Sequence, residues 1–181
     1  MSITLLDQNT INKIAAGEVV ERPSSVVKEL VENAIDAGAT AITVEIKEGG
    51  ISFIRVTDNG SGINKDEIEI AFKRHATSKI KSIEDLMAVS SLGFRGEALA
   101  SIAAVSQVEL ITKTANSISG VRYTIDGGVP GEVAEIGAPE GTTFIVRNLF
   151  YNTPVRRKFL KTATTEGGYI GSLVEYLALS H

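Results

Sequence analysis

The segment PSSVVKELVENAIDAG, from Pro23 to Gly38, decides the fold class of this chain. Proline suits the first position of a helix, and glycine readily adopts the left-handed backbone that ends one. The apolar residues between them recur at helical spacing: Val26, Val27, Leu30, Val31, Ala34 and Ile35. The segment therefore predicts an amphipathic helix whose apolar side packs on a core.

Residues 41–57 follow this helix and change to the alternating pattern of β-strands. Ile42, Val44 and Ile46 alternate with polar residues, and Glu48-Gly49-Gly50 forms a turn before a second run, so a β-hairpin is predicted. Helices are expected from Lys65 to about Arg74, from Glu97 to Ala104 and from Pro154 onward, and strands at 108–112, 121–125 and 142–146. This order predicts an α+β fold, a two-layer α/β sandwich with a mixed β-sheet covered by helices.

Composition and length narrow the function classes. The chain has 181 residues, a net charge of -4 and no cysteine, and we interpret residues 1–181 as one domain. We find no secretory signal and no apolar run of about 20 residues, so we expect a soluble, cytoplasmic protein with no membrane contact. Ile170, Leu173, Val174 and Leu177 carry a helical pattern almost to His181, which indicates that the natural chain continues.

Glu29 and Asn33 are the polar pair of the first helix that we expect to be partly buried. They are i, i+4 neighbours at one edge of the apolar stripe, whereas Lys28 and Glu32 fall on the far side, where we expect solvent. For an arbitrary glutamate and asparagine on a helix, a surface or capping pair is the ordinary interpretation.

Two glycine-containing loops are candidate ligand-binding segments. Asp58-Asn59-Gly60-Ser61-Gly62 directly follows a predicted strand, and Ser91 to Glu97 opens a predicted helix, whose N-terminal N–H groups suit phosphate. Lys79 offers a cation for the same purpose. Taken alone, the first is an ordinary tight turn and the second is more often a plain connection.

Other common sites are absent from the sequence. No GxxxxGK[ST] motif occurs, and Gly60-Ser61-Gly62 lacks the third glycine of a dinucleotide fingerprint. A histidine-rich metal site or a Ser-His-Asp triad would depend on His75, since the other histidine is His181.

Six blocks of the sequence together resemble the MutL branch of the ATPase superfamily that contains DNA gyrase, heat-shock chaperones and histidine kinases. The blocks are IAAGEVVERP (14–23), VKELVENA (27–34), DAGA (36–39), RHATSK (74–79), LGFRGEAL (92–99) and FYNTP (150–154). The resemblance covers nearly the whole chain, with looser agreement at 114–139 and after 162. It implies the Bergerat-type fold of that superfamily, with a left-handed βαβ unit.

The resemblance also implies roles for individual residues. Glu29 corresponds to the general base that activates water, Asn33 to a ligand of Mg²⁺, and Asp58 to the acceptor of the adenine amino group. Further residues match the family's ATP site or the lid over the phosphates: Ala37, Gly62, Thr77, Lys79, Gly93, Phe94, Arg95, Gly96, Glu97, Ala98, Leu99 and Thr143.

The implied function is an ATP-driven switch in DNA mismatch repair. Slow Mg²⁺-dependent ATP hydrolysis would control an N-terminal homodimer and couple a MutS-type mismatch recognition protein to a downstream endonuclease, helicase or sliding clamp. A candidate DNA contact is the basic group Arg156, Arg157, Lys158 and Lys161, although a solvated helix face is the plainer interpretation. Because MutL-like ATPases take a phosphate-contacting lysine from a second domain, which would follow His181 together with a C-terminal dimerisation domain, this chain is expected to hydrolyse ATP weakly.

A gyrase-like ATPase subunit, a histidine kinase and a non-hydrolysing interaction module remain alternative interpretations. The 14–23 and 150–154 blocks argue against the first two, and the presence of Glu29, Asn33 and Asp58 argues against the third.

Overall fold

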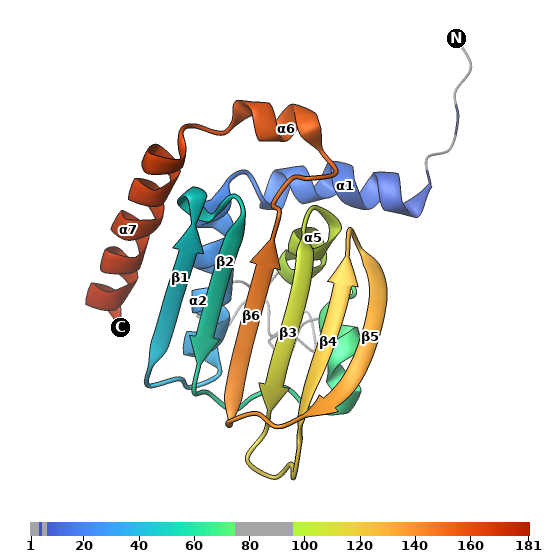
Figure 1. Cartoon of the computed structure of the whole chain (residues 1–181), viewed down its shortest axis with the longest axis vertical. Helices are drawn as coiled ribbons and strands as arrows, with labels where there is room; N and C mark the ends of the chain where they lie inside the picture. The colour runs from blue at the N-terminus through green and yellow to red at the C-terminus, as the bar shows by residue number, and fades with distance from the viewer. Residues whose placement is uncertain (1–3, 5–6, 75–95) are drawn as a thin grey trace, which may run out of the picture.

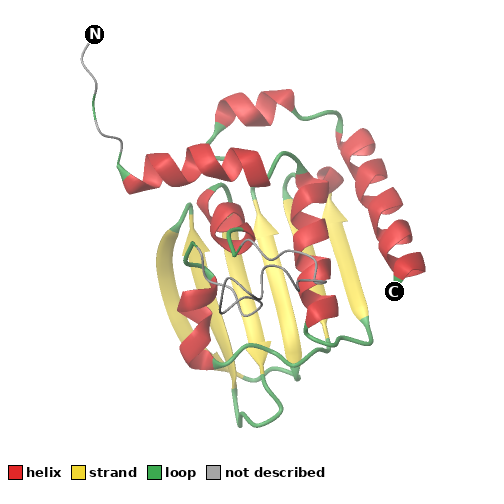
Figure 2. Cartoon of the chain, turned by 180° about the vertical axis from the view of Figure 1, so that it is seen from behind, coloured by secondary structure: helices red, strands yellow, loops and turns green. Residues whose placement is uncertain are grey.

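The computed structural model describes residue 4 and residues 7–74 and 96–181. It contains one six-stranded sheet with helices on one face, as Figures 1 and 2 show from opposite sides. The strands are β1 (Ile42–Lys47), β2 (Phe53–Asp58), β3 (Gln107–Lys113), β4 (Gly120–Asp126), β5 (Val129–Ile136) and β6 (Gly141–Arg147). The helices are α1 (Gln8–Val19), α2 (Pro23–Asp36), α3 (Ile68–Ala71), α5 (Ala98–Ala104), α6 (Pro154–Phe159) and α7 (Ala163–Ser180), with 3-10 turns η1 (Glu48–Gly50) and η2 (Lys65–Glu67).

The strands lie in the order β1-β2-β6-β3-β4-β5. All five pairings are antiparallel, so the α+β sandwich is confirmed but the expectation of a mixed sheet is corrected. The physical reason is the position of β6, the last strand of the chain. It inserts between β2 and β3 and runs opposite to both, so strands that follow a helical crossover never pair directly.

Helix α2 confirms the prediction made from residues 23–38. It begins at Pro23 and ends at Asp36, and Gly38 has the positive φ of 73° that a helix terminator requires. One side of α2 packs on the sheet, and α7 packs beside it on the β1 side of the molecule (Figure 1). Helix α2 therefore has packed neighbours on more than one side.

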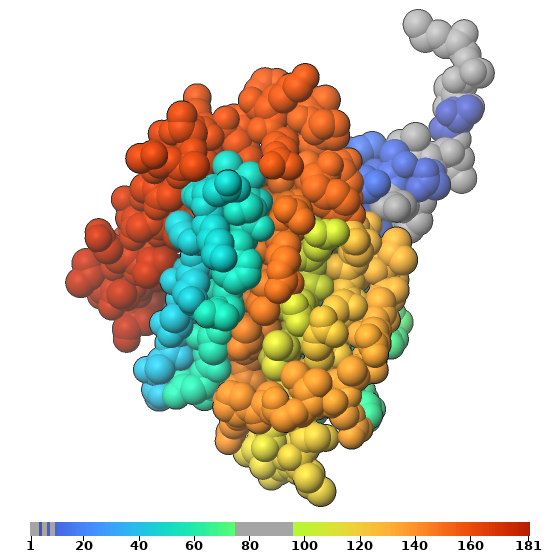
Figure 3. All heavy atoms as spheres, in the orientation of Figure 1, coloured from blue at the N-terminus to red at the C-terminus, as the bar shows by residue number. Residues whose placement is uncertain are grey.

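The core lies between the helices and one face of the sheet. Val26, Val27 and Leu30 of α2 are at most 1% exposed and meet Ile54 and Val56 of β2 in the same cluster. The opposite face of the sheet carries charged pairs, including Arg55 with Glu45 and Glu109 with Arg122 and Arg147. That face of the sheet is turned toward the viewer in Figure 3, and none of the described helices covers it.

Two elements were not predicted, and one is shorter than predicted. Strand β5 lies at the sheet edge with five exposed residues in succession, so it lacks the alternating pattern that marks a half-buried strand. Helix α1 is the second unpredicted element, although Asp7 caps it by accepting a bond from Thr10 N at 3.0 Å. The helix expected to reach Arg74 ends at Ala71.

Asn64 and Glu67 have the three-residue spacing of a helix capping box, but they interact in another way. The side chain of Asn64 donates to Glu67 Oε2 at 2.9 Å, and it caps no backbone N–H. The first turn after Asn64 is accordingly the 3-10 turn η2.

Candidate functional site

The C-terminal end of α2 and the loop after β2 are held together by main-chain contacts. Ser61 N donates to Ala37 O at 3.0 Å, which places the loop against the last turn of α2. A side chain at Gly60 would meet Ala37 at 2.9 Å, and one at Gly62, where φ is 70°, would come within 2.2 Å of Lys113 O. Both glycines are thus required by close backbone approach, one toward α2 and one toward the end of β3.

Asp58 is the buried acid of this loop, only 9% exposed at the end of β2. Its Oδ1 accepts hydrogen bonds from Gly60 N at 2.8 Å and from Thr142 N at 3.3 Å. Burial raises the pKa of Asp58 above its ordinary value, and these two N–H donors oppose that rise. Both bonds that the described residues give Asp58 end on Oδ1, so Oδ2 is left to accept a bond from a ligand.

Thr142, rather than Thr143, shares a face of the sheet with Asp58. Asp58 pairs with Thr142 across β2 and β6, and paired residues direct their side chains to the same face. Thr143 pairs with Thr57 and its hydroxyl donates to Thr57 Oγ1 at 3.2 Å on the opposite face. The structure therefore does not bring Thr143 to Asp58, because side chains alternate along a strand.

Glu29 and Asn33 lie on α2, about two turns and one turn, respectively, before the end that contacts the Asp58 loop. Both side chains are half-buried, in line with the expectation for this pair. From Ala37 back to Glu29 is eight residues, or about 12 Å along the helix axis at about 1.5 Å per residue. An elongated ligand that contacts Asp58 and extends along α2 toward its N-terminus would therefore pass Asn33 before Glu29.

Glu32 was expected to face solvent, but the structure shows that it is buried. It is 2% exposed, and its Oε1 lies 3.4 Å from Lys28 Nζ, while Oε2 has no hydrogen-bond partner among the described residues. A helical wheel that assumes one packed side places Glu32 in water. Helix α7 gives α2 a second packed side, so that assumption fails.

Part of the predicted lid falls within the structure. Gly96 has a positive φ of 61°, Glu97 is the N-cap residue of α5, and Ala98 and Leu99 form its first turn. Thr77, Lys79, Gly93, Phe94 and Arg95 lie outside the described residues.

Residues 21–135 match the family model described as histidine kinase-, DNA gyrase B-, and HSP90-like ATPase. That stretch contains α2, Asp58, the Gly60 to Gly62 loop and α5. The chain belongs to this ATPase family.

Curated relatives of this ATPase chain are DNA mismatch repair proteins named MutL. One from Agathobacter rectalis is 71% identical over 99% of this chain and 28% of its own length. Another, from Caldanaerobacter subterraneus subsp. tengcongensis, is 58% identical over 99% of this chain and 30% of its own. The chain thus spans less than a third of these relatives.

Solved structures agree with the family assignment of this ATPase chain. The Aquifex aeolicus MutL ATPase domain complexed with ADP has a TM-score of 0.73 and 37% identity, covering 89% of this chain and 56% of that one. A crystal structure of the N-terminal domain of a DNA repair protein has a TM-score of 0.75 and 31% identity. The match covers 91% of this chain and 47% of that one.

The basic group predicted as a DNA contact is divided in this ATPase chain. Arg157, Lys158 and Lys161 are exposed on and after α6, whereas Arg156 is half-buried. The guanidinium of Arg156 lies over Gly17 of α1 and donates to Ile14 O at 3.4 Å. Arg156 therefore joins α6 to α1, and three cations remain at the surface.

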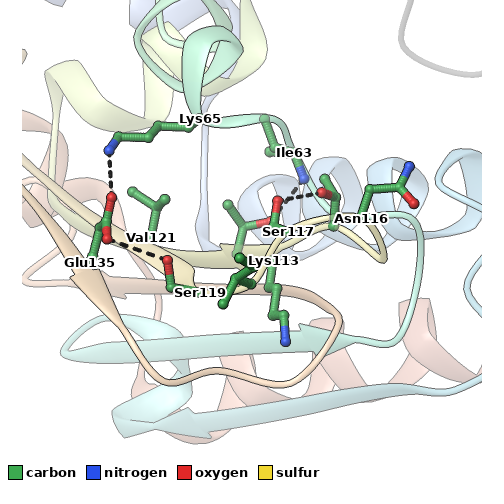
Figure 4. A pocket seen from close by; sticks show the side chains of 11 residues that line it. Ile63, Lys65, Lys113, Asn116, Ser117, Ser119, Val121 and Glu135 are labelled. Carbon is green, nitrogen blue, oxygen red and sulfur yellow. Dashed lines mark hydrogen bonds and ion pairs between the residues drawn. The ribbon is translucent and has the colours of Figure 1, made fainter.

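A cavity of about 340 Å³ adjoins the loop of this ATPase chain on the side of the β3–β4 hairpin. Beside it, Lys65 and Ser119 both contact Glu135, as Figure 4 shows. The distance from Lys65 Nζ to Glu135 Oε1 is 2.8 Å. Lys65 holds the pKa of Glu135 below its ordinary value. Ile63 and Thr112 line the cavity, and Glu29, Asn33 and Asp58 do not.

Thr142, which pairs with Asp58, and Thr112, whose hydroxyl lies 3.1 Å from that of Thr142, are further candidate residues that the sequence did not predict. Both are buried, at 1% and 6% exposure. The only signal in the sequence was their place as polar residues at the ends of two apolar strands.

Proposed function

We propose that this chain is the nucleotide-binding part of a MutL-type DNA mismatch repair protein, and that it binds ATP with Mg²⁺ and hydrolyses it slowly. The observation that carries the proposal is the buried carboxylate of Asp58, fixed through Oδ1 at the start of a loop that Ser61 N joins to the end of α2. The ADP complex of the related ATPase domain and the MutL relatives support it.

In this proposal Asp58 Oδ2 accepts the amino group of adenine, and Thr142 replaces Thr143 as its partner in the base pocket. A carboxylate selects a donor group, so adenine with its amino group is favoured over guanine with its carbonyl. Gly62 keeps its role in the loop, because no side chain fits between it and β3. Ala37 takes part through its backbone, as the acceptor that holds Ser61.

Asn33 is the chain's candidate ligand for Mg²⁺. Its amide oxygen is of the kind that Mg²⁺ binds, and the described residues hold no cluster of three His, Asp or Glu side chains for a metal. A magnesium ion at Asn33 would therefore take its other ligands from phosphate and water, and it would neutralise phosphate charge there. Glu29, half-buried one turn earlier, would orient and deprotonate the attacking water.

The remaining parts of the proposal concern the whole protein. Gly96 to Leu99, which lie within the described residues, would form one end of a lid over the phosphates. ATP binding would favour an N-terminal homodimer. A MutS-type recognition protein, DNA and a downstream endonuclease, helicase or sliding clamp would be the partners. None of the described helices is long and apolar enough to cross a membrane, and we propose a cytoplasmic location.

Calorimetric titration with ATP and GTP, with Mg²⁺ present, tests the proposal, together with phosphate release in Mg²⁺ and in excess chelator. We expect ATP to bind in preference to GTP and phosphate release to require Mg²⁺. Binding of ATP without any release, even in a longer chain, would instead indicate a non-hydrolysing module. No binding of ATP would overturn the proposed function.

A further inference from the structure

Thr112 occupies a junction of three hydrogen bonds beside the proposed base pocket. Its Oγ1 accepts from Ile63 N at 2.9 Å, donates to Gly141 O at 3.1 Å and lies 3.1 Å from Thr142 Oγ1. It therefore joins the loop after β2 to the first two residues of β6. Because Thr112 is 1% exposed, water does not compete for these bonds.

The proton inventory of this junction fixes the direction of the bond between the two hydroxyls. A threonine hydroxyl has one proton and two lone pairs. The carbonyl of Gly141 can only accept, so it takes the proton of Thr112. The N–H of Ile63 can only donate, so it takes one lone pair of Thr112. The second lone pair then accepts the proton of Thr142.

We infer that Thr112 is a positioning residue that makes the hydroxyl of Thr142 an acceptor toward the base pocket. With its proton turned to Thr112, Thr142 Oγ1 presents only lone pairs to a ligand. Asp58 Oδ2 is also an acceptor, so both groups beside the base favour an amino group and oppose a carbonyl. Thr112 would thus contribute to the choice of a 6-aminopurine without touching it, and this inference rests on the proposed ATP site.

The test compares ATP with inosine triphosphate, which carries a carbonyl where adenine has its amino group. In Thr112→Val the valine keeps the shape but frees the Thr142 proton, which can then point to a carbonyl. A neutral hydrogen bond contributes on the order of 1 kcal/mol, so we expect the ATP preference to fall about fivefold. Thr112→Ser keeps the hydroxyl, so it should retain the preference for ATP of the unsubstituted chain. Thr124→Val, which removes a hydroxyl that accepts from Glu132 N at 3.1 Å near β5, should leave it unchanged.

A purely structural role would weaken both nucleotides equally and leave their ratio unchanged, which would overturn the inference. Loss of the ATP preference in Thr112→Ser would also overturn the inference. Should Thr112→Val not fold, NMR of the unsubstituted chain decides the matter. We expect a slowly exchanging hydroxyl proton on Thr142 with a cross-peak to Hβ of Thr112, and a Thr142 proton in fast exchange would contradict it. If the unsubstituted chain binds neither nucleotide, the proposed function fails instead, while the NMR result still tests the proton arrangement.

Discussion

Asp58 and Thr142 face each other across β2 and β6, and Thr142 N donates a 3.3 Å hydrogen bond to Asp58 Oδ1. The last strand of the chain therefore fixes a carboxylate from its first hairpin. Because the bond comes from main chain, any residue at position 142 except proline would keep it. The carboxylate stays oriented, and its other oxygen accepts no hydrogen bond from the described residues.

Asp58→Asn is expected to abolish ATP binding without loss of stability. The amide oxygen can still accept from Gly60 N and Thr142 N, but the NH₂ group then occupies the place of Oδ2 and opposes the adenine amino group. Since the change also removes a buried charge, the melting temperature at neutral pH should be equal or higher. Calorimetry and thermal melting measure the two effects. A folded variant that binds ATP as tightly as the unsubstituted chain would refute the role of Asp58.

ATP affinity is expected to fall on acidification earlier than an ordinary aspartate would allow. The pKa of Asp58 is raised, chiefly by burial, so the carboxyl takes up its proton at a higher pH than usual as the pH falls. Protonation of Asp58 stabilises the folded state, but the proton occupies a carboxyl oxygen that the adenine amino group needs as its acceptor. Carbon-detected NMR of the Asp58 carboxyl, recorded beside ATP titrations, checks both. Titration of Asp58 at or below the ordinary aspartate range would contradict the prediction.

Glu29→Gln is expected to leave ATP binding intact and to slow hydrolysis. The amide keeps the size of the side chain but cannot take a proton from water, and a positioned base contributes roughly 10²- to 10⁴-fold to rate. Phosphate release under single-turnover conditions gives the rate. Glu175→Gln, an exposed position on α7, serves as the control and should not alter it. Equal rates for both variants would exclude Glu29 as the base.

The sequence was sufficient to predict elements whose burial follows from neighbouring residues. It was insufficient where contacts between distant elements decide which side chains are buried or share a face. Helix α2 and the β1–β2 hairpin follow from residues next to one another, and both were predicted. Glu32 is buried on a helix that packs against both the sheet and α7, and Thr142, not Thr143, faces Asp58 because of the register between β2 and β6. Neither of these long-range arrangements leaves a local pattern in the sequence. For the same reason the exposed edge strand β5 gave no signal.

Gly62→Ala is expected to destabilise the chain more than Gly38→Ala. Both glycines have positive φ, 70° and 73°, so each alanine bears a similar backbone cost of about 1–2 kcal/mol. Nothing lies within 4 Å of a side chain at Gly38, whereas one at Gly62 would overlap Lys113 O at 2.2 Å. Urea unfolding of the two variants isolates the cost of that overlap. Equal destabilisation of the two variants would show that the loop can move away from β3.

DNA binding is expected to weaken in a salt-dependent way in Arg157→Ala and in Lys158→Ala. Arg156→Ala is not expected to change the salt dependence of DNA binding. Removing one cation that binds a duplex phosphate should reduce the slope of log affinity against log salt by about 0.9. Arg156 contacts Ile14 O and covers Gly17, so its replacement should lower stability and leave the slope unchanged. Lys47→Ala, on the edge strand β1, is the control for removal of a cation elsewhere. If Arg157→Ala and Lys47→Ala change the slope equally, the attraction is general to the surface, and α6 does not form a DNA contact.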